Sequence, residues 1–452
     1  MDLLAVSVLL AALIVGVFLT ETTIRSTDVG AAVVVGLFLL QETDVFEMGF
    51  TAGGFNVIPN DLLFAVLAAA ATARLLRAQV LTTAQRLMIG LAAVVAWAVL
   101  QGVGDYGAAS TLNESRRYLA FVAIVLYFST MEPDRTLRER IGRMWVYAAL
   151  GLCGLALLRW AANAAGLTGG FFGGGGTLRV LPSASALVIG QAAMMGVPAL
   201  RERAVGLWKY LTPLMLVFVV LLQHRTVWVV VLVGLGYLLL RERALTPRLM
   251  ASIAAGLVLF AAVSLTLFDD TDQAVSEQLA DSATRTNTFE WRVAGWEALM
   301  RDLGPETLTE TLLGQPPGGG WERRFDGLVV DVSPHNYYVE TYLRLGVVGL
   351  LLTLSIYGMA LAGRRWNEGA DTSDATTPAL LSHHALSTVI GVNLLYFITY
   401  SPDRMQAMLL GVGCAFLAGR DSTPAPRADR SSPTARNERL PISQRPLQRY
   451  AD

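Results

Sequence analysis

Long apolar runs separated by short polar segments cover most of the chain. A helix needs about 20 apolar residues to cross roughly 30 Å of hydrocarbon. Runs near that length occupy residues 3–20, 61–78, 86–102, 117–130, 142–163, 183–200, 207–222, 226–240, 249–268, 345–363, 380–399 and 404–418, and a shorter run occupies 29–41. The pattern predicts an all-α fold, a polytopic integral membrane helical bundle of 12–13 transmembrane helices, with the ambiguity in the first two runs.

Arg-rich short loops set the expected orientation, because such loops stay on the cytoplasmic side of a membrane. The basic residues of five loops mark that side: Arg74, Arg77 and Arg86; Arg135, Arg138, Arg140 and Arg143; Arg201, Arg203 and Lys209; Arg241, Arg243 and Arg248; Arg364 and Arg365. The alternate loops are then extracytoplasmic, and they cover residues 41–60, 103–116, 164–182 and 269–334.

This orientation divides the chain into four expected parts. Transmembrane helices occupy 1–268, an extracytoplasmic loop with an interfacial helix occupies 269–334, further transmembrane helices occupy 335–419, and a disordered cytoplasmic tail occupies 420–452. The first apolar run has neither a basic leading region nor a small-residue cleavage site, so we expect a retained span and not a signal peptide. The tail, with five Pro and seven Arg, fits a solvated linker better than a lipid-binding segment.

Composition supports a membrane protein. Of the 452 residues, 54% are hydrophobic and only 16% are charged, whereas about 25% of a typical soluble domain is charged. The two cysteines, Cys153 and Cys414, both fall inside predicted spans, so neither a disulfide framework nor a cysteine metal site is supported. Nothing in the sequence indicates nucleic-acid binding.

The segment 332–361 joins a polar cluster directly to an apolar helix of membrane length. Ser333 can cap that helix and Pro334 can occupy its first turn, which places His335 and Asn336 at the positive end of the helix dipole. The dipole disfavours a protonated imidazole, so His335 is expected to be neutral and able to accept a proton. The alternative is an interfacial histidine within an ordinary aromatic belt of Tyr337, Tyr338 and Tyr342.

Residues 207–240 are too long for one transmembrane helix. A single helix of that length would measure about 50 Å, which exceeds the bilayer. The chain must therefore break near QHRT at 223–226, and the turn presents His224 and Arg225 on the outer side. A guanidinium group between apolar helices needs a counterion, water or a bound anion, and its forked donors suit a phosphate. The alternative is an arginine that extends to the lipid headgroups.

The long outer loop contains a second candidate arginine. The stretch TNTFEWRVAGWEALMRDLG has helical spacing, with one apolar stripe of Phe289, Val293, Trp296 and Met300. Arg292 lies on or beside this stripe and is expected to point toward Arg225 and His335. The alternative is a helix that only anchors at the membrane interface. The following LLGQPPGGG reads as a flexible turn, and it lacks the GK[ST] of a phosphate loop.

Further arginines lie on the predicted outer side: Arg179 after a glycine run, the pair Arg116 and Arg117, and Arg404 within SPDR. An anionic substrate on that side would account for them, and interface anchoring is the alternative for each. The sequence shows no HExxH and no serine elbow. We therefore expect chemistry that needs no metal and no cofactor.

The candidate features follow one order along the chain. A polar turn with Arg225 precedes R(x)3W at 292–296, then a Gly-Pro turn, then HN at 335–336 and an aromatic-rich helix that contains LGVVGLLL. This order resembles the O-antigen ligase and O-antigen polymerase superfamily, by motif over roughly 207–363 and by span number over most of the chain. One departure is LRLG at 343–346 where many relatives carry an acidic residue. It predicts that Arg344 pairs with Glu340 one turn back.

Members of that family are integral-membrane glycosyltransferases of the GT-C type that take a glycan from a polyprenyl diphosphate at the outer face of the cytoplasmic membrane. The resemblance implies that His335 is the essential histidine and that Arg225 and Arg292 match the arginines that hold the donor diphosphate. Asn336 is expected to orient His335 or bind sugar. The other candidate substrate-binding residues are Arg179, Tyr338 and His224.

The expected protein is a multi-pass enzyme of the cytoplasmic (inner) membrane, with an extracytoplasmic active site that serves polysaccharide biosynthesis in the cell envelope. It would act as a ligase by an inverting mechanism. Its expected partners are a polyprenyl-diphosphate-linked glycan donor, a glycan or lipid-linked acceptor and membrane lipids. A polysaccharide polymerase would use the same constellation of residues, and a transporter or flippase of a lipid-linked glycan is the third alternative.

Overall fold

The computed structural model describes residues 15–43, 50–52, 55–132, 134–167, 179–201, 207–241, 287–325, 327–362 and 380–418. Several sequence-based expectations lie outside these residues. They are the start of the first span, the span at 249–268, most of the glycine run near 170, the first part of the long outer loop and the tail from 420.

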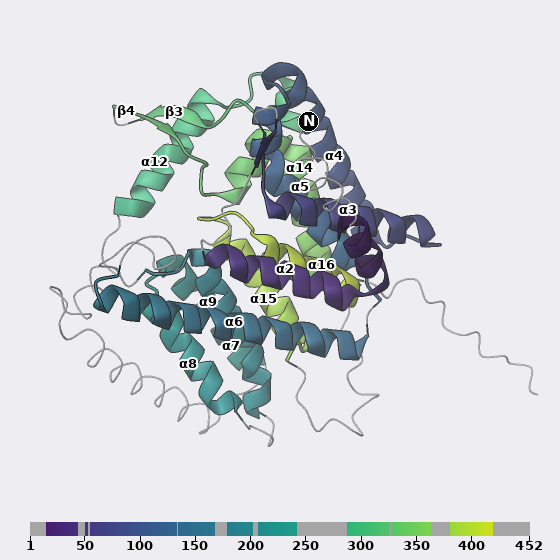
Figure 1. The fold of residues 1–452 in the computed structure, drawn as a ribbon. Helices are drawn as coiled ribbons and strands as arrows, with labels where there is room; N and C mark the ends of the chain where they lie inside the picture. The colour runs from purple at the N-terminus through teal and green to yellow at the C-terminus, as the bar shows by residue number, and fades with distance from the viewer. Residues whose placement is uncertain are drawn as a thin grey trace, which may run out of the picture.

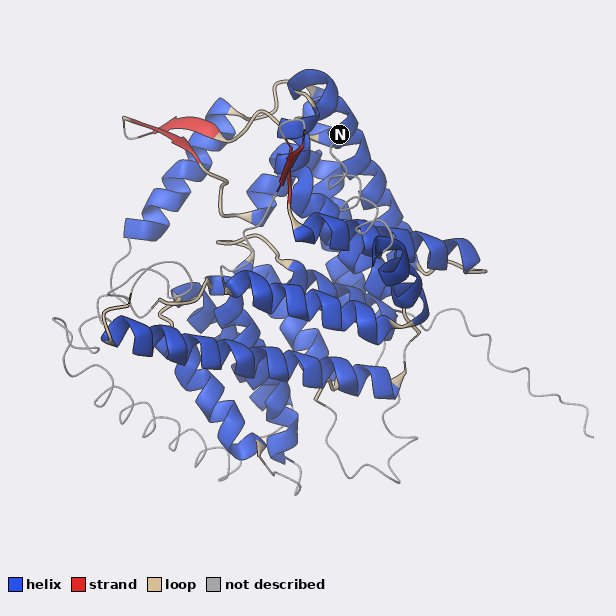
Figure 2. Cartoon of the chain, in the orientation of Figure 1, coloured by secondary structure: helices blue, strands red, loops and turns tan. Residues whose placement is uncertain are grey.

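The described chain is predominantly helical (Figures 1 and 2). Residues 15–25 are helical. The helices that follow are α2 (Thr27–Glu42), α3 (Pro59–Arg77), α4 (Thr83–Tyr106), α5 (Ala108–Ser129), α6 (Arg135–Ala164), α7 (Ser183–Arg201), α8 (Trp208–Leu221), α9 (Arg225–Arg241), α12 (Asn287–Asp302), α13 (Leu308–Leu313), α14 (Tyr337–Ala362), α15 (His383–Tyr396) and α16 (Arg404–Ala418).

Two short antiparallel hairpins qualify the all-α prediction. One pairs β1 (Phe50–Ala52) with β2 (Phe55–Val57), and the other pairs β3 (Glu322–Phe325) with β4 (Leu328–Asp331). Both fall in segments predicted only as outer loops. The β3–β4 hairpin packs beside α12, and together they stand at one corner of the molecule (Figure 1).

Apart from α12 and α13, which lie in the predicted outer loop, the described helices coincide with predicted apolar runs. The largest shift is at α5, which begins nine residues before the run at 117–130. Four of them are long and apolar enough to cross a membrane: Pro59–Arg77, Thr83–Tyr106, Thr136–Ala164 and Tyr337–Ala362. Shorter apolar helices cover Ser183–Pro198, Tyr210–Leu221 and Arg404–Phe416. In the interior, α5 packs against α3, α4 and α16, while α7 packs against α8 and α9.

The predicted break near QHRT is present. Helix α8 ends at Leu221 and α9 begins at Arg225. Between them Gln223 adopts a positive φ of 56°, a conformation that interrupts a right-handed helix. The break lets α8 and α9 run as two separate helices against α7 instead of one that is longer than a bilayer is thick.

Helix α14 is kinked at Gly346, where φ is 65° and ψ is −170°, a region open almost only to glycine. The short helix α13 approaches the kink so closely that a Cβ on Gly346 would lie 2.2 Å from the carbonyl oxygen of Leu312. Gln315 also donates its backbone N–H to the carbonyl of Leu343 at 2.7 Å. The kink and the missing side chain of Gly346 therefore allow α13 to pack directly against the backbone of α14.

The Gly-Pro turn after α13 is anchored and not the flexible segment that its composition predicted. Glu114, at the start of α5, accepts the backbone N–H groups of Gly318 at 2.6 Å and Gly320 at 3.2 Å. The same carboxylate lies 2.6 Å from the Nε of Arg344, whose guanidinium group stacks 4.2 Å from the centre of the Trp321 ring. The predicted Arg344–Glu340 pair is therefore wrong, because Arg344 turns toward Glu114 in a different helix.

Gly346→Ala should destabilise the protein by about 3 kcal/mol, because the new methyl group meets the α13 backbone and the residue is forced into a glycine conformation. Thermal unfolding of the purified protein in detergent measures this. Gly358→Ala in the same helix is the matched control, since a Cβ there meets nothing within 4 Å. Equal melting temperatures for the two variants would contradict the close packing of α13 against Gly346.

Candidate active site

Four of the predicted site residues line one cavity of about 380 Å³: Arg179, His224, Arg225 and Arg292. They come from segments that are far apart in sequence, namely the residues before α7, the α8–α9 turn and the first half of α12. The end of α15 and the connection that follows it complete the wall, through residues 395–400. The described residues that line this arginine cavity include no carboxylate.

The α8–α9 turn is held rigidly at the cavity. His224 donates from Nε2 to the carbonyl of Leu181 at 2.8 Å, which ties the turn to the segment that carries Arg179. Thr399 donates its hydroxyl to Thr226 at 3.0 Å. Arg225 is the first residue of α9, so the positive end of that helix dipole adds to its charge. The turn therefore presents Arg225 and a helix N-terminus to the same space.

Helix α12 directs Arg292 into the cavity, as predicted. The guanidinium group lies 5.1 Å from the centre of the Tyr400 ring, and Trp296 donates its indole N–H to the carbonyl of Pro334 at 2.6 Å. The second contact fastens α12 to the residue before His335. The contact of Arg292 with the Tyr400 ring and the hydrogen bond from Trp296 to Pro334 together set the direction of α12.

The packed face of α12 differs from the predicted stripe. Phe289 and Met300 remain 52% and 39% exposed, whereas the buried positions are Gly295, Ala298 and Leu299. Leu299 joins a small apolar cluster with Trp321 and Leu343, and Gly295 faces Arg323. The helix uses this neighbouring face because the β3–β4 hairpin, which the sequence did not predict, packs there.

His335 lies between the β3–β4 hairpin and α14, half-buried, with a positive φ of 49°. It is not among the residues that line the arginine cavity. Burial lowers the pKa of His335, and the positive charges of Arg292, Arg117 and Arg323 lower it further. The imidazole is therefore neutral near pH 7, as the sequence predicted, but burial and three arginines provide the cause.

Asn336, and not Ser333, caps α14. Its Oδ1 accepts the backbone N–H groups of Tyr338 at 3.0 Å and Val339 at 3.1 Å, and the helix begins at Tyr337. Tyr338 donates its hydroxyl to the carbonyl of Leu394 at 2.6 Å. Both predicted substrate-binding groups are thus engaged within the protein, and we assign them to positioning the segment that carries His335.

Sequence reasoning missed the role of Glu340. This carboxylate is fully buried, one turn into α14, and it lies 2.6 Å from Nη1 of Arg117. The hydroxyl of Ser401 also donates to it, at 2.8 Å. Arg117 was noted only as one of several outward arginines. The four-residue spacing from Asn336 marks Glu340 as one turn away, but nothing local identifies a partner that is 223 residues distant.

Arg323 was also not predicted from the sequence, and it holds the chain that leads into the segment of His335. It is 3% exposed, and it donates to the carbonyls of Val332 at 2.6 Å and Trp321 at 3.2 Å. These bonds close the β3–β4 hairpin directly before Ser333. The hairpin therefore fixes where the chain enters the segment with His335.

The connection 397–403 between α15 and α16 joins these parts. Phe397 accepts the backbone N–H of Tyr337 at 3.0 Å, so the connection is attached to the start of α14. Further along, Thr399 contacts α9, Tyr400 contacts Arg292 and Ser401 contacts Glu340. One short segment thus touches every element that carries a candidate catalytic residue.

No protein-family model matches the chain, and no curated protein is significantly similar to it. The family resemblance therefore stays a prediction that rests on the motifs. Among the described residues, no group of three or more His, Cys, Asp and Glu side chains is placed to hold a metal ion.

His224→Gln should make the protein less sensitive to acid. Burial lowers the pKa of His224 from about 6.5 to about 4, so between these values the unfolded chain binds a proton that the folded chain does not. Stability contributed by the neutral imidazole is full above pH 6.5 and is lost as the pH falls toward 4. Glutamine keeps a donor for Leu181 without titrating.

Melting temperatures of both proteins between pH 7 and pH 4 measure the effect. The variant should lose roughly 3 kcal/mol less stability than the wild type over that interval. Parallel curves for the two proteins would show that His224 is not buried in its neutral form.

Proposed function

We propose that this chain is a membrane glycosyltransferase of the O-antigen ligase type. In this proposal it transfers a glycan from a polyprenyl-diphosphate donor to an acceptor at the outer face of the cytoplasmic membrane. The observation that carries the proposal is the convergence of Arg225 and Arg292, with Arg179 and His224, on one cavity beside the segment of His335. Forked guanidinium donors match the oxygens of a diphosphate.

The reaction would be a single inverting displacement. The acceptor hydroxyl attacks the anomeric carbon from the side opposite the diphosphate, and the bond from that carbon to the phosphate oxygen breaks. The leaving diphosphate takes the electron pair, and Arg225 and Arg292 neutralise its growing charge. His335 accepts the proton of the acceptor hydroxyl, which requires the neutral imidazole that its lowered pKa provides.

Several features support placing this site at the outer end of a membrane bundle. Four helices are long and apolar enough to span, and the short loops at their opposite ends carry clusters of arginine. The arginine cavity lies where α15 ends and α9 begins, so the proposed chemistry would take place at the membrane surface.

The same placement favours an enzyme over a transporter or flippase. A transport pathway usually places charge near the middle of broken, repeat-related helices. Here Arg225 is the first residue of its helix, and Arg292 lies on α12, outside the four long apolar helices. A polymerase would use the same residues, and it differs only in the acceptor.

The test is an assay with the purified full chain in nanodiscs, a polyprenyl-diphosphate glycan and candidate acceptors. Release of free polyprenyl diphosphate together with glycosylated acceptor supports transfer. One added glycan indicates a ligase, and a ladder of repeats indicates a polymerase. Passage of the glycan across the bilayer without release of the diphosphate would identify a transporter and contradict the proposal.

Arg225→Lys should lower turnover about 100-fold although it keeps the charge, because lysine lacks the forked donors that would hold the leaving group. The rate of diphosphate release measures this. Arg301→Lys is the matched control, since Arg301 lies on α12 with a side chain that is 67% exposed. Wild-type turnover in the Arg225 variant would refute its role at the phosphate.

A further inference from the structure

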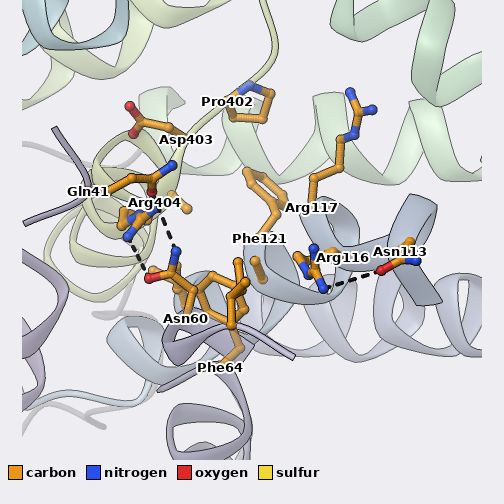
Figure 3. Close-up of a pocket in the computed structure, with 14 residues that line it drawn as sticks. Gln41, Asn60, Phe64, Asn113, Arg116, Arg117, Phe121, Pro402, Asp403 and Arg404 are labelled. Atoms are coloured by element: carbon orange, nitrogen blue, oxygen red, sulfur yellow. Dashed lines mark hydrogen bonds between the residues drawn. The ribbon is translucent and has the colours of Figure 1, made fainter. Parts of the chain in front are cut away.

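A second cavity, of about 290 Å³, is lined in part by Pro402 and Asp403 at the end of the connection 397–403 (Figure 3). It is lined by the end of α2, by the first turns of α3 and α16, and by the residues of α5 from Asn113 to Ile124 that face it. Tyr400 lines the arginine cavity, while Pro402 and Asp403 line the second one. Neighbouring residues of one connection therefore line the two cavities.

The second cavity differs from the described lining of the arginine cavity in its carboxylates: Asp403 forms part of its wall, and two of its arginines pair with acidic side chains. Arg116 pairs with Asp61 at 2.8 Å, and Arg117 pairs with the buried Glu340 at 2.6 Å. Arg404 donates to the side-chain oxygen of Asn60 at 2.9 Å and lines the cavity together with Asp403. This balance does not select for an anion.

The remaining lining suits a neutral, hydroxyl-rich ligand. Gln41, Asn60 and Asn113 supply amide groups that are partly engaged within the protein: Asn60 donates to Gln41 at 3.5 Å and accepts from Arg404, and Asn113 accepts from Arg116 at 3.4 Å. An amide has two N–H hydrogens and two lone pairs, so each of the three keeps capacity for a ligand hydroxyl. Phe64 and Phe121 supply aromatic rings, and these rings and the three amides gather around the same space in Figure 3. Amides and paired charges bind sugar hydroxyls, while the faces of aromatic rings pack against the C–H groups of a sugar ring.

The segment of His335 is attached to residues near both cavities, although His335 itself lines neither of them: Trp296, on the helix of Arg292, donates to the carbonyl of Pro334, and Arg117 pairs with Glu340 in the first turn of α14. Arg292 lines the arginine cavity and Arg117 lines the second cavity, and both are close enough for their charges to act on the imidazole. An acceptor bound in the second cavity would therefore lie close to the segment that carries His335.

We propose that the second cavity is the acceptor site, and that it binds the uncharged, hydroxyl-bearing sugar end of the acceptor glycan. This inference rests on the proposed function, because it takes the arginine cavity as the donor site. Gln41, Asn60 and Arg404 would hold the sugar hydroxyls, and Phe64 would pack against the ring.

Kinetics with donor and acceptor varied separately test the assignment. Asn60→Ala should raise the KM for the acceptor about tenfold and leave the KM for the polyprenyl-diphosphate donor unchanged. Thr72→Ala on the exposed side of the same helix is the matched control and should change neither. A rise in the donor KM alone, or no change in either constant, would overturn the assignment.

Photo-crosslinking tests it without relying on turnover. Phe64→p-benzoylphenylalanine in the full chain, irradiated in native membranes, should form adducts that carry sugar and no diphosphate. Leu62→p-benzoylphenylalanine is the control, because Leu62 lies two residues away, is 41% exposed and does not line the cavity. Phe289→p-benzoylphenylalanine reports on the arginine cavity and should capture polyprenyl diphosphate. Mass spectrometry of each adduct identifies what is bound.

These outcomes distinguish a failure of the acceptor site from a failure of the proposed function. If position 64 captures only lipid, captures diphosphate or matches position 62, the acceptor site is overturned whatever position 289 captures. If position 289 captures no diphosphate while position 64 captures sugar, the proposed function fails on the donor side and the sugar site stands.

Discussion

Charge at the end of an apolar helix bundle must be compensated, and this constraint organises the described part of the protein. A guanidinium or carboxylate group without a partner or water costs several kcal/mol in such surroundings. Glu340 is fully buried and is compensated by Arg117 and Ser401, and the nearly buried Arg344 is compensated by Glu114. These pairs join α5, α14 and the connection 397–403, and so they fix the frame that surrounds His335.

The same constraint gives the two cavities their different character. In the arginine cavity, three arginines and His224 gather with no carboxylate among the described lining residues. In the second cavity, the arginines lie beside Asp61, Glu340 and Asp403. A concentration of positive charge suits a diphosphate, whereas balanced charge with amides suits sugar hydroxyls. Burial and the positive charges of Arg292 and Arg117 both lower the pKa of His335, so its imidazole is neutral.

The features that depend on local sequence could be predicted, and those that depend on distant partners could not. The helices and the break at 222–224 follow from apolar length, helix geometry and helical spacing. Arg292 lines one cavity with Arg225 as expected, although α12 packs on a different face from the predicted stripe. The cap of α14 was misplaced because two residues of suitable type precede that helix, and only the observed bonds of Asn336 decide between them. The partner of Arg344 was wrong because Glu114 is 230 residues away along the chain. The anchored Gly-Pro turn and the packed face of α12 were not predicted for the same reason. The turn depends on Glu114, which is distant in sequence, and the packed face depends on the β3–β4 hairpin, which was not predicted.

The most direct measurement is an experimental structure of the full chain in nanodiscs with polyprenyl diphosphate bound. Density for the diphosphate is expected between the guanidinium groups of Arg225 and Arg292, with the lipid chain leaving toward the membrane and the imidazole of His335 facing the terminal phosphate. Diphosphate density elsewhere, or a His335 side chain that points away from both arginines, would contradict the account.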